Sequence, residues 1–359
     1  MFRRIKKLLP TRIKKAALSF FSREEIELPL GNRAFIFLAA DYGNIGDLAI
    51  SAAQALFLAK YANFPHVVRI PISRTNALLR SVKSQINPGD LITIVGGGNM
   101  GSLYPDIEKL RQLVIRTFPK NRIVCFPQTL DWADSVESDR TLTRIVRVYS
   151  QHPNLHVFAR ESVTQRKLDA LFRSHSSVHI GYAPDIVLSA TASELGSVVD
   201  AAPAGILLCL RDDRECALDS AQRSELQTAL AHTGHHLEMT DTHAGGSGLS
   251  EALCAQLVGE KVNQFGAAKL VVTDRLHGMI LSVIAGTPCL VLPNSNHKIR
   301  QTWKDWLGDA PQVRFLAPGD MTELPELLSE LLAVPRRELG RAPVAYRHYE
   351  GLTQATVHS

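Results

Sequence analysis

Residues 34–62, AFIFLAADYGNIGDLAISAAQALFLAKYA, contain the pattern that decides the fold: an apolar run, a turn rich in Gly, Asn and Asp, and a segment with a helical apolar period. An uninterrupted apolar run is typical of a strand that is buried on both faces. The pattern recurs in DLITIV before GGGNMG, in NRIVCF before PQTLDW and in LHVFA before RES. The repetition therefore predicts a parallel sheet with helices on both faces.

A second series of the same kind follows residues 190–203, SATASELGSVVDAA, whose small and polar composition suits a linker. GILLCL, KLVV and TPCLVLP are its clearest strands. We therefore predict an α/β protein with two doubly wound, Rossmann-like domains that face a cleft. The predicted N-terminal domain covers residues 31–195 and the C-terminal domain residues 203–335, between a basic tail of residues 1–30 and a C-terminal tail of residues 336–359.

The positive charge of the chain is concentrated at its N-terminus. The net charge is +5, but residues 1–20 hold seven Lys or Arg and no acidic residue, so the remainder carries a small negative charge. This distribution argues against nucleic acid as a partner. The tail could bind an anionic membrane surface or be a solvated terminus, and its sequence leaves both open.

The rest of the chain indicates no membrane-spanning segment and no disulfide framework. No later stretch reaches the about 18 uncharged, apolar residues that a spanning helix needs. Cys125, Cys209 and Cys289, three of the five cysteines, lie within apolar runs, which favours reduced thiols. We expect a cytoplasmic protein, with attachment to the inner membrane face depending on the tail.

The unusual motifs of the first domain follow its strands, at the edge where open parallel sheets bind ligands. In DYGNIGD, Asn44 and Asp47 could cap the next helix or point into the cleft. GGGNMG has three consecutive glycines, whose conformational cost favours a binding loop. In this loop Gly97 would approach a ligand and Asn99 would offer its amide to a sugar hydroxyl.

Other motifs give weaker signals. Gln128 in PQT and Arg160 in ARES sit where strands should end, and either could bind an acceptor or tie loops together. The segment DTHAGGSG could form a mobile lid or a disordered surface loop. His235, His236 and Glu238 do not have a zinc-site spacing, so we predict no metal.

TDRLHG joins an apolar strand to the helix MILSVIA. Arg275, His277 and Gly278 lie in its first turn, where backbone amides and the helix dipole attract anions. Arg211 ends the strand GILLCL, so Arg211 and Arg275 should emerge at the same edge if both strands belong to one parallel sheet. The pattern predicts a phosphate or carboxylate site. Alternatively, Arg211 pairs with one of the two aspartates that follow it.

The chain contains, in this order, DYGNIGD, GGGNMGSLY, FPQT, ARES, APDIVL, LRDD and TDRLHGMILSVIAGTPCLVL. Together these motifs resemble the polysaccharide pyruvyl transferases over residues 34–293. The resemblance implies a fold like the two-domain GT-B glycosyltransferases. It also implies transfer of pyruvate from phosphoenolpyruvate, as co-substrate and without a cofactor, to a sugar of an exopolysaccharide or other cell-surface glycan precursor, usually as a cyclic ketal.

The resemblance also implies roles for individual residues. The donor site would use Arg211, Arg275 and His277, with Gly278 beside them, and phosphoenolpyruvate is a compact polyanion that suits these charges. Because histidine titrates near neutral pH, His277 could be a general acid, and Asp47 could be the base for acceptor hydroxyls. The expected acceptor-binding residues are Asn44, Asp47, Gly97, Asn99 and Gln128.

Two other functions compete with this one. A GT-B glycosyltransferase could hold the diphosphate of a nucleotide sugar with Arg275 and the helix N-terminus. It would need a carboxylate for the ribose and a base-stacking pocket, and the sequence indicates neither. A non-catalytic sugar-binding or scaffolding protein would not need the charges of Arg275 and His277.

Overall fold

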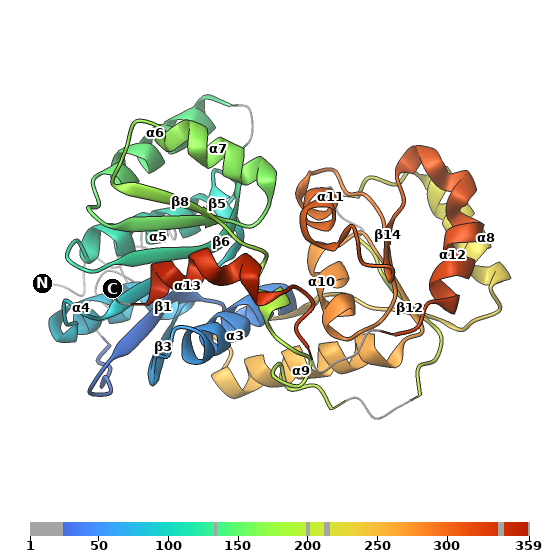
Figure 1. The fold of residues 1–359 in the computed structure, drawn as a ribbon, viewed down its shortest axis with the longest axis horizontal. Helices are drawn as coiled ribbons and strands as arrows, with labels where there is room; N and C mark the ends of the chain where they lie inside the picture. The colour runs from blue at the N-terminus through green and yellow to red at the C-terminus, as the bar shows by residue number, and fades with distance from the viewer. Residues whose placement is uncertain (1–23, 133–134, 199–201, 212–215, 337–340, 358–359) are drawn as a thin grey trace, which may run out of the picture.

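The computed structural model describes residues 24–132, 135–198, 202–211, 216–336 and 341–357. Figure 1 shows two α/β units side by side along the longest axis of the molecule. Each unit is built on one sheet. The basic tail of residues 1–20 lies outside the described residues.

The first sheet contains β1 (Arg33–Ala39), β3 (His66–Pro71), β4 (Leu91–Ile94), β5 (Gly97–Gly101), β6 (Ile123–Asp131), β7 (Leu155–Ala159) and β8 (Val178–Tyr182). The order is β3-β1-β4-β6-β7-β8, all parallel, and β5 pairs with β6 beyond the end of β4. Every residue of β1 is buried, as expected for a strand covered on both faces. The accompanying helices are η1 (Ile72–Arg74), α3 (Ile45–Lys60), α4 (Thr75–Gln85), α5 (Pro105–Thr117), α6 (Val136–Ser150) and α7 (Ser162–Phe172).

The second sheet contains β9 (Ile206–Cys209), β10 (Leu237–Met239), β12 (Leu270–Thr273), β13 (Cys289–Val291) and β14 (Val313–Phe315). Its order is β10-β9-β12-β13-β14, again all parallel. Its helices are α8 (Ser220–His232), α9 (Glu251–Ala267), α10 (Leu276–Ile284), α11 (Lys298–Thr302), η3 (Trp303–Leu307), η4 (Pro318–Glu323) and α12 (Leu324–Ala333). The predicted α/β class with two doubly wound domains is confirmed.

Both sheets reverse their strand order beside their first strand, between β1 and β4 in one sheet and between β9 and β12 in the other. Open parallel sheets bind ligands beyond the carboxyl ends of the strands at such a point. In the second sheet, Cys209 of β9 pairs with Thr273 of β12, so Arg211 and Arg275 leave the same edge close together, as predicted.

One apolar cluster runs through both domains, and a second lies within the C-terminal domain. α3 packs against α9 and against η2 (Ile186–Ser189). Phe57 of α3 and Val262 of α9 are fully buried members of the same hydrophobic cluster. Because a large apolar contact restrains domain movement, packing holds the two domains in their relative positions.

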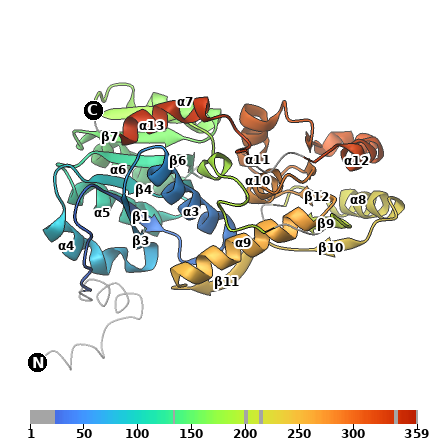
Figure 2. The ribbon, with the colours of Figure 1, turned by 60° about the horizontal axis from the view of Figure 1, so that its bottom comes forward.

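A two-stranded antiparallel ribbon also joins the domains, and Figure 2 shows it near α9. It consists of β2 (Tyr42–Asn44) and β11 (His243–Ser247). A Cβ added at Gly43 would lie 2.0 Å from the carbonyl oxygen of Gly245, so only glycine allows this approach. The segment DTHAGGSG therefore contributes a bridging strand rather than the lid or disordered loop predicted from its sequence.

The described C-terminal segment returns to the first domain. It includes η5 (Tyr346–Tyr349) and α13 (Glu350–Thr356), which lies against the first sheet in Figure 1. The Tyr349 hydroxyl donates to the carbonyl oxygen of Asp185 at 3.0 Å. The segment predicted as a tail thus contains packed helices, and the exact domain bounds stay a prediction.

Two further observations concern membrane-spanning helices and the cysteines. Among the described residues, no helix combines the length and apolarity that crossing a bilayer requires. All five cysteines are free thiols.

Candidate active site

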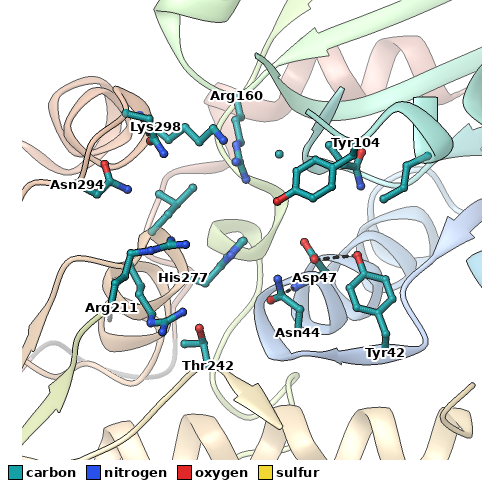
Figure 3. Close-up of a pocket in the computed structure, with 16 residues that line it drawn as sticks. Tyr42, Asn44, Asp47, Tyr104, Arg160, Arg211, Thr242, His277, Asn294 and Lys298 are labelled. Atoms are coloured by element: carbon teal, nitrogen blue, oxygen red, sulfur yellow. Dashed lines mark hydrogen bonds between the residues drawn. The ribbon is translucent and has the colours of Figure 1, made fainter. Parts of the chain in front are cut away.

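A cavity of about 290 Å³ lies where the strand-order reversals of the two sheets face each other. Figure 3 shows side chains pointing into it from both domains. The first domain supplies Tyr42, Asn44, Asp47, Asn99, Tyr104 and Arg160. The second domain supplies Arg211, Arg275, His277, Asn294, Asn296 and Lys298. One wall is thus rich in cations, and the other combines amide, hydroxyl and carboxylate groups.

The cationic wall begins at the ends of β9 and β12. The backbone N–H of Arg211 donates to the Asp274 carboxylate at 2.8 Å, which ties the two strand ends together. Arg275 donates through Nη2 to Asp241 at 2.9 Å, yet its side chain stays largely buried. The structure therefore brings Arg211, Arg275 and His277 to one cavity. The alternative pairing of Arg211 with Asp212 or Asp213 lies outside the described residues.

Three buried polar atoms in this cavity have no hydrogen-bond partner within the described residues: Arg275 Nε, His277 Nε2 and Asn294 Oδ1. Buried polar groups in folded proteins are nearly always satisfied, and each exception needs an explanation. All three belong to residues that line the same cavity. Because these atoms have almost no accessible surface, a ligand could bond to them only after their side chains turn toward the cavity.

The N-terminal end of α10 is part of the cationic wall. Leu276 and His277 of its first turn line the cavity, so the positive end of the helix dipole faces the cavity. Gly278 does not line it. A Cβ added at Gly278 would lie 2.2 Å from Thr273 Oγ1. The predicted donor contact of Gly278 is therefore corrected to a packing role, because its missing side chain lets α10 approach β12.

The imidazole of His277 is held between the domains. A Cβ added at Gly46, in the first turn of α3, would lie 2.2 Å from His277 Nδ1. On the other side, His277 Nε2 is 3.6 Å from Asp185 Oδ2. Arg160 donates through Nη1 to the same carboxylate oxygen at 2.8 Å. The first domain thus positions the histidine of the second.

Asp185 is ionised in this setting. Burial alone would raise the pKa of its carboxyl group, but the contact with His277 and the charge of Arg160 lower the pKa to about 2. A buried carboxylate beside an imidazole fixes the orientation of the ring. His277, Asp185 and Arg160 therefore form a unit suited to proton transfer.

Asn44 and Asp47 both stabilise the start of α3 and line the cavity. Asn44 is the N-cap of α3 and accepts from the backbone N–H of Asp47 at 3.3 Å. The Asp47 carboxylate accepts from the Tyr42 hydroxyl at 2.9 Å. Burial and the charge of Asp47 raise the pKa of Tyr42, so this hydroxyl stays protonated and donates. Both predicted side chains line the cavity and can reach an acceptor.

The segment GGGNMG is not the open loop predicted from its glycines, because Gly97–Gly101 forms β5 against β6. Gly97 has a φ of 122°, which favours glycine, and it lies beside Asp47 without lining the cavity. Gly98 does line the cavity, and a Cβ added there would lie 3.0 Å from Arg160 Nη2. The glycines thus bring the backbone close to other site residues.

Asn99 and Gln128 belong to one buried network. Arg111 donates through Nη2 to the Asn99 side-chain oxygen and pairs with Glu108. Asn99 lines the cavity. Gln128 is fully buried, donates to the Val95 carbonyl oxygen and lies within 3.5 Å of Arg111 Nη2. Gln128, predicted to contact an acceptor, instead supports the backbone beneath Asn99 and lies outside the cavity.

Several lining residues were not predicted from the sequence. Asn294, Asn296 and Lys298 follow β13, and the polar run NSNHK after an apolar strand was the available signal. Lys298 pairs with Asp131 at 3.0 Å. The Thr242 carbonyl oxygen accepts from the backbone N–H of Ile45, a contact between domains that no local pattern indicates. Within the described residues, no His, Cys, Asp and Glu cluster could hold a metal ion.

Comparisons with known proteins agree with this geometry. General stress protein 30 of Bacillus subtilis (strain 168) is 31% identical over 306 residues, which are 84% of this chain and 85% of that protein. Pyruvyl transferase 1 of Schizosaccharomyces pombe is 28% identical over 280 residues, 74% of this chain and 68% of its own. The structure of UDP-GlcNAc 2-epimerase from Methanocaldococcus jannaschii has a TM-score of 0.50 and 10% identity, covering 90% of this chain and 100% of that chain.

The likeness to the epimerase is one of fold alone, and it confirms the predicted GT-B-like arrangement. A sequence model of the family described as Polysaccharide pyruvyl transferase matches residues 44–296, which include both sides of the cavity. The resemblance drawn from the motifs is thereby confirmed, and the chain belongs to the polysaccharide pyruvyl transferase family.

Proposed function

We propose that the protein transfers pyruvate from phosphoenolpyruvate to a sugar of an exopolysaccharide or other cell-surface glycan precursor and forms a ketal. Family membership supports a pyruvyl transferase. The observation that carries the choice of donor is the set of cations around one small cavity, which includes Arg211, Arg275 and Lys298. A compact polyanion suits a cavity lined by several cationic side chains.

The donor would bind at the cationic wall. Its carboxylate and phosphate would accept from Arg211 and Arg275 and from the first turn of α10. The position of Arg275 in the lining of the cavity supports this assignment. Lys298 would face the donor from the opposite side and stabilise charge on the departing phosphate.

The chemistry needs one proton delivered and two acceptor hydroxyls that attack. One hydroxyl attacks the central carbon of phosphoenolpyruvate while the methylene carbon takes a proton, so that the carbon–carbon double bond becomes a methyl group. The second hydroxyl then displaces phosphate, and the ketal closes. His277, supported by Asp185, would supply the proton, and Asp47 would accept the protons of the hydroxyls. The arginines would stabilise the negative charge of the carboxylate and phosphate.

The acceptor sugar would bind at the wall of the first domain. Asn44, Asp47, Asn99 and Tyr104 offer amide, carboxylate and hydroxyl groups at the cavity surface. Such groups suit sugar hydroxyls, because each hydroxyl both donates and accepts a hydrogen bond. The donor and acceptor would thus approach from opposite domains.

Thermal melting with three ligands tests the function. Phosphoenolpyruvate should stabilise the protein, whereas UDP-hexoses and a free oligosaccharide should have little effect in its absence. Mass spectrometry of a candidate repeat unit incubated with phosphoenolpyruvate should then reveal an added pyruvyl group and release of phosphate. Stabilisation by a nucleotide sugar alone would favour a glycosyltransferase, and a response to the oligosaccharide alone would favour a binding protein.

We also propose that the reaction takes place in the cytoplasm, with residues 1–20 attached to the anionic inner membrane face. The support is the seven basic residues among apolar ones in this segment, because each basic residue contributes about 1 kcal/mol to binding an anionic surface. Deletion of residues 1–20 should move the protein from the membrane fraction to the supernatant. An unchanged membrane fraction would contradict this proposal.

A further inference from the structure

A second cavity, of about 590 Å³, lies beside the first on the acceptor side. The two cavities share the loop of residues 102–105 as a wall. Tyr104 lines the first cavity, whereas its neighbours Leu103 and Pro105 line the second. α5 is shared in the same way, with Ile107 in the first cavity and Glu108 in the second. Only one turn of chain therefore separates the second cavity from the proposed sugar site.

The second cavity offers hydroxyl groups and cations. Ser138, which is buried, donates to Ser102 at 2.9 Å, and its hydroxyl is also 2.9 Å from that of Ser135. Arg140 and Arg144 of α6 line the same cavity. Hydroxyl groups beside guanidinium groups are a frequent combination in phosphate-binding sites.

The charge of Arg144 is available to a ligand. The Arg144 side chain has no hydrogen bond or ion pair within the described residues. Arg140 approaches Glu137 only at 3.9 Å, and both of these side chains are mostly exposed, so the pair contributes little. Each guanidinium group can therefore turn to an anion without breaking a strong interaction.

Two carboxylates line the cavity, those of Glu108 and Glu137, and each lies near an arginine. Glu108 is buried and pairs with Arg111, which is equally buried. It also accepts from the Tyr149 hydroxyl at 3.1 Å and from the Gln112 amide at 3.0 Å. Ser135 is the N-cap of α6, so the positive end of that 15-residue helix adds to the field of the arginines.

We propose that the second cavity binds a phosphate or diphosphate group carried by the acceptor, so that the sugar attached to it reaches the first cavity past Tyr104. This inference rests on the proposed function for the identity of the sugar but not for the anion site itself. Leu103 lines the cavity, and Val136 lies in the chain between Ser135 and Glu137, which line it. Both are exposed apolar side chains, with 45% and 68% exposure. They would accommodate the apolar group on the far side of such a diphosphate.

Binding of inorganic diphosphate, measured by calorimetry with phosphoenolpyruvate at saturation, tests the anion site. Replacement of both arginines, Arg140→Gln with Arg144→Gln, should weaken binding by about tenfold or more, since each charge-assisted hydrogen bond contributes on that scale. Arg147→Gln is the matched control, because Arg147 is exposed on the same helix and does not line the cavity. Equal binding by the double variant and the control would overturn the proposal.

Kinetics then show whether the anion belongs to a lipid-linked or to a soluble acceptor. A glycosyl diphosphate that ends in a short polyprenyl chain, the same glycosyl diphosphate without the chain, and the neutral glycan are compared as acceptors. The double variant should raise KM about tenfold for both diphosphates, leave kcat unchanged, and leave the neutral glycan unaffected. A lower KM for the prenylated acceptor identifies a lipid source, and equal values identify a soluble one.

Failure of the proposed function is distinguishable from failure of this inference. If the protein is not a pyruvyl transferase, no acceptor turns over, while the difference in diphosphate binding between the double variant and the control persists. If the anion site is wrong, turnover is observed and KM for the diphosphate acceptors does not respond to the two arginines.

Discussion

Gly46→Ala should disable the protein through His277 while leaving the fold largely intact. The added Cβ would lie 2.2 Å from His277 Nδ1 and 2.8 Å from its Cβ. Non-bonded contacts between heavy atoms are comfortable at about 3.5 Å. The imidazole or the start of α3 must therefore move by about 1 Å. Because the Cβ of His277 is involved, rotation of the ring alone does not relieve the clash.

A displacement of this size at a reacting group costs about 100-fold in rate. We expect kcat for pyruvyl transfer to fall by about that factor. Overpacking should also lower the free energy of unfolding by about 1–3 kcal/mol. Release of phosphate from phosphoenolpyruvate in the presence of acceptor measures kcat. Gly351→Ala is the matched control, because a Cβ there meets no atom within 4 Å. A kcat equal to that of the control would refute the positioning of His277 by Gly46.

Four further substitutions test other parts of the site and its surroundings. His277→Ala should lower kcat by about 100-fold or more with little change in phosphoenolpyruvate binding by calorimetry, whereas Arg275→Ala should weaken that binding about tenfold or more. The pKa of Asp185, about 2 in the folded protein against 3.8 ordinarily, means that its stabilisation is complete above pH 4 and lost between about pH 4 and 2. Over that interval, the unfolding free energy measured with urea should therefore fall by about 2 kcal/mol more in the wild type than in Asp185→Asn. Asp305→Ala, which removes an acceptor for the Ser162 backbone N–H at 2.7 Å, should lower the unfolding free energy by about 1–3 kcal/mol.

The sequence predicted the edge of each sheet at which the site lies, because apolar runs followed by Gly, Asn, Asp or Arg are local features. Arg211 and Arg275 were placed correctly beside each other once both strands were taken as parallel members of one sheet. Asn44 and Asp47 followed from the same reasoning. Each of these residues directly follows its own strand, so its position at the sheet edge can be inferred from a short stretch of sequence.

The predictions that were wrong have a common physical cause: the residues concerned pack against elements that are distant in the sequence. Gln128 was expected beyond a strand end, but β6 runs on to Asp131 because β5 pairs with its second half. Gly43 accommodates β11 and Gly46 accommodates His277, and both are contacts with distant chain that the motif DYGNIGD does not reveal. Lys298 reaches the cavity because α11 packs near the first domain, a relation that no local pattern contains.

Neither domain contains a complete site. His277 comes from the second domain, but its neighbours Gly46 and Asp185 come from the first. A wide opening of the cleft would separate these groups, break the ribbon of β2 and β11 and expose the apolar contact of α3 with α9. Because each of these losses costs free energy, the site is best understood as preformed, with substrates entering from the solvent side. Tyr104, 49% exposed and located between the two cavities, stands on that route, so its side chain should influence KM for the acceptor more than KM for phosphoenolpyruvate.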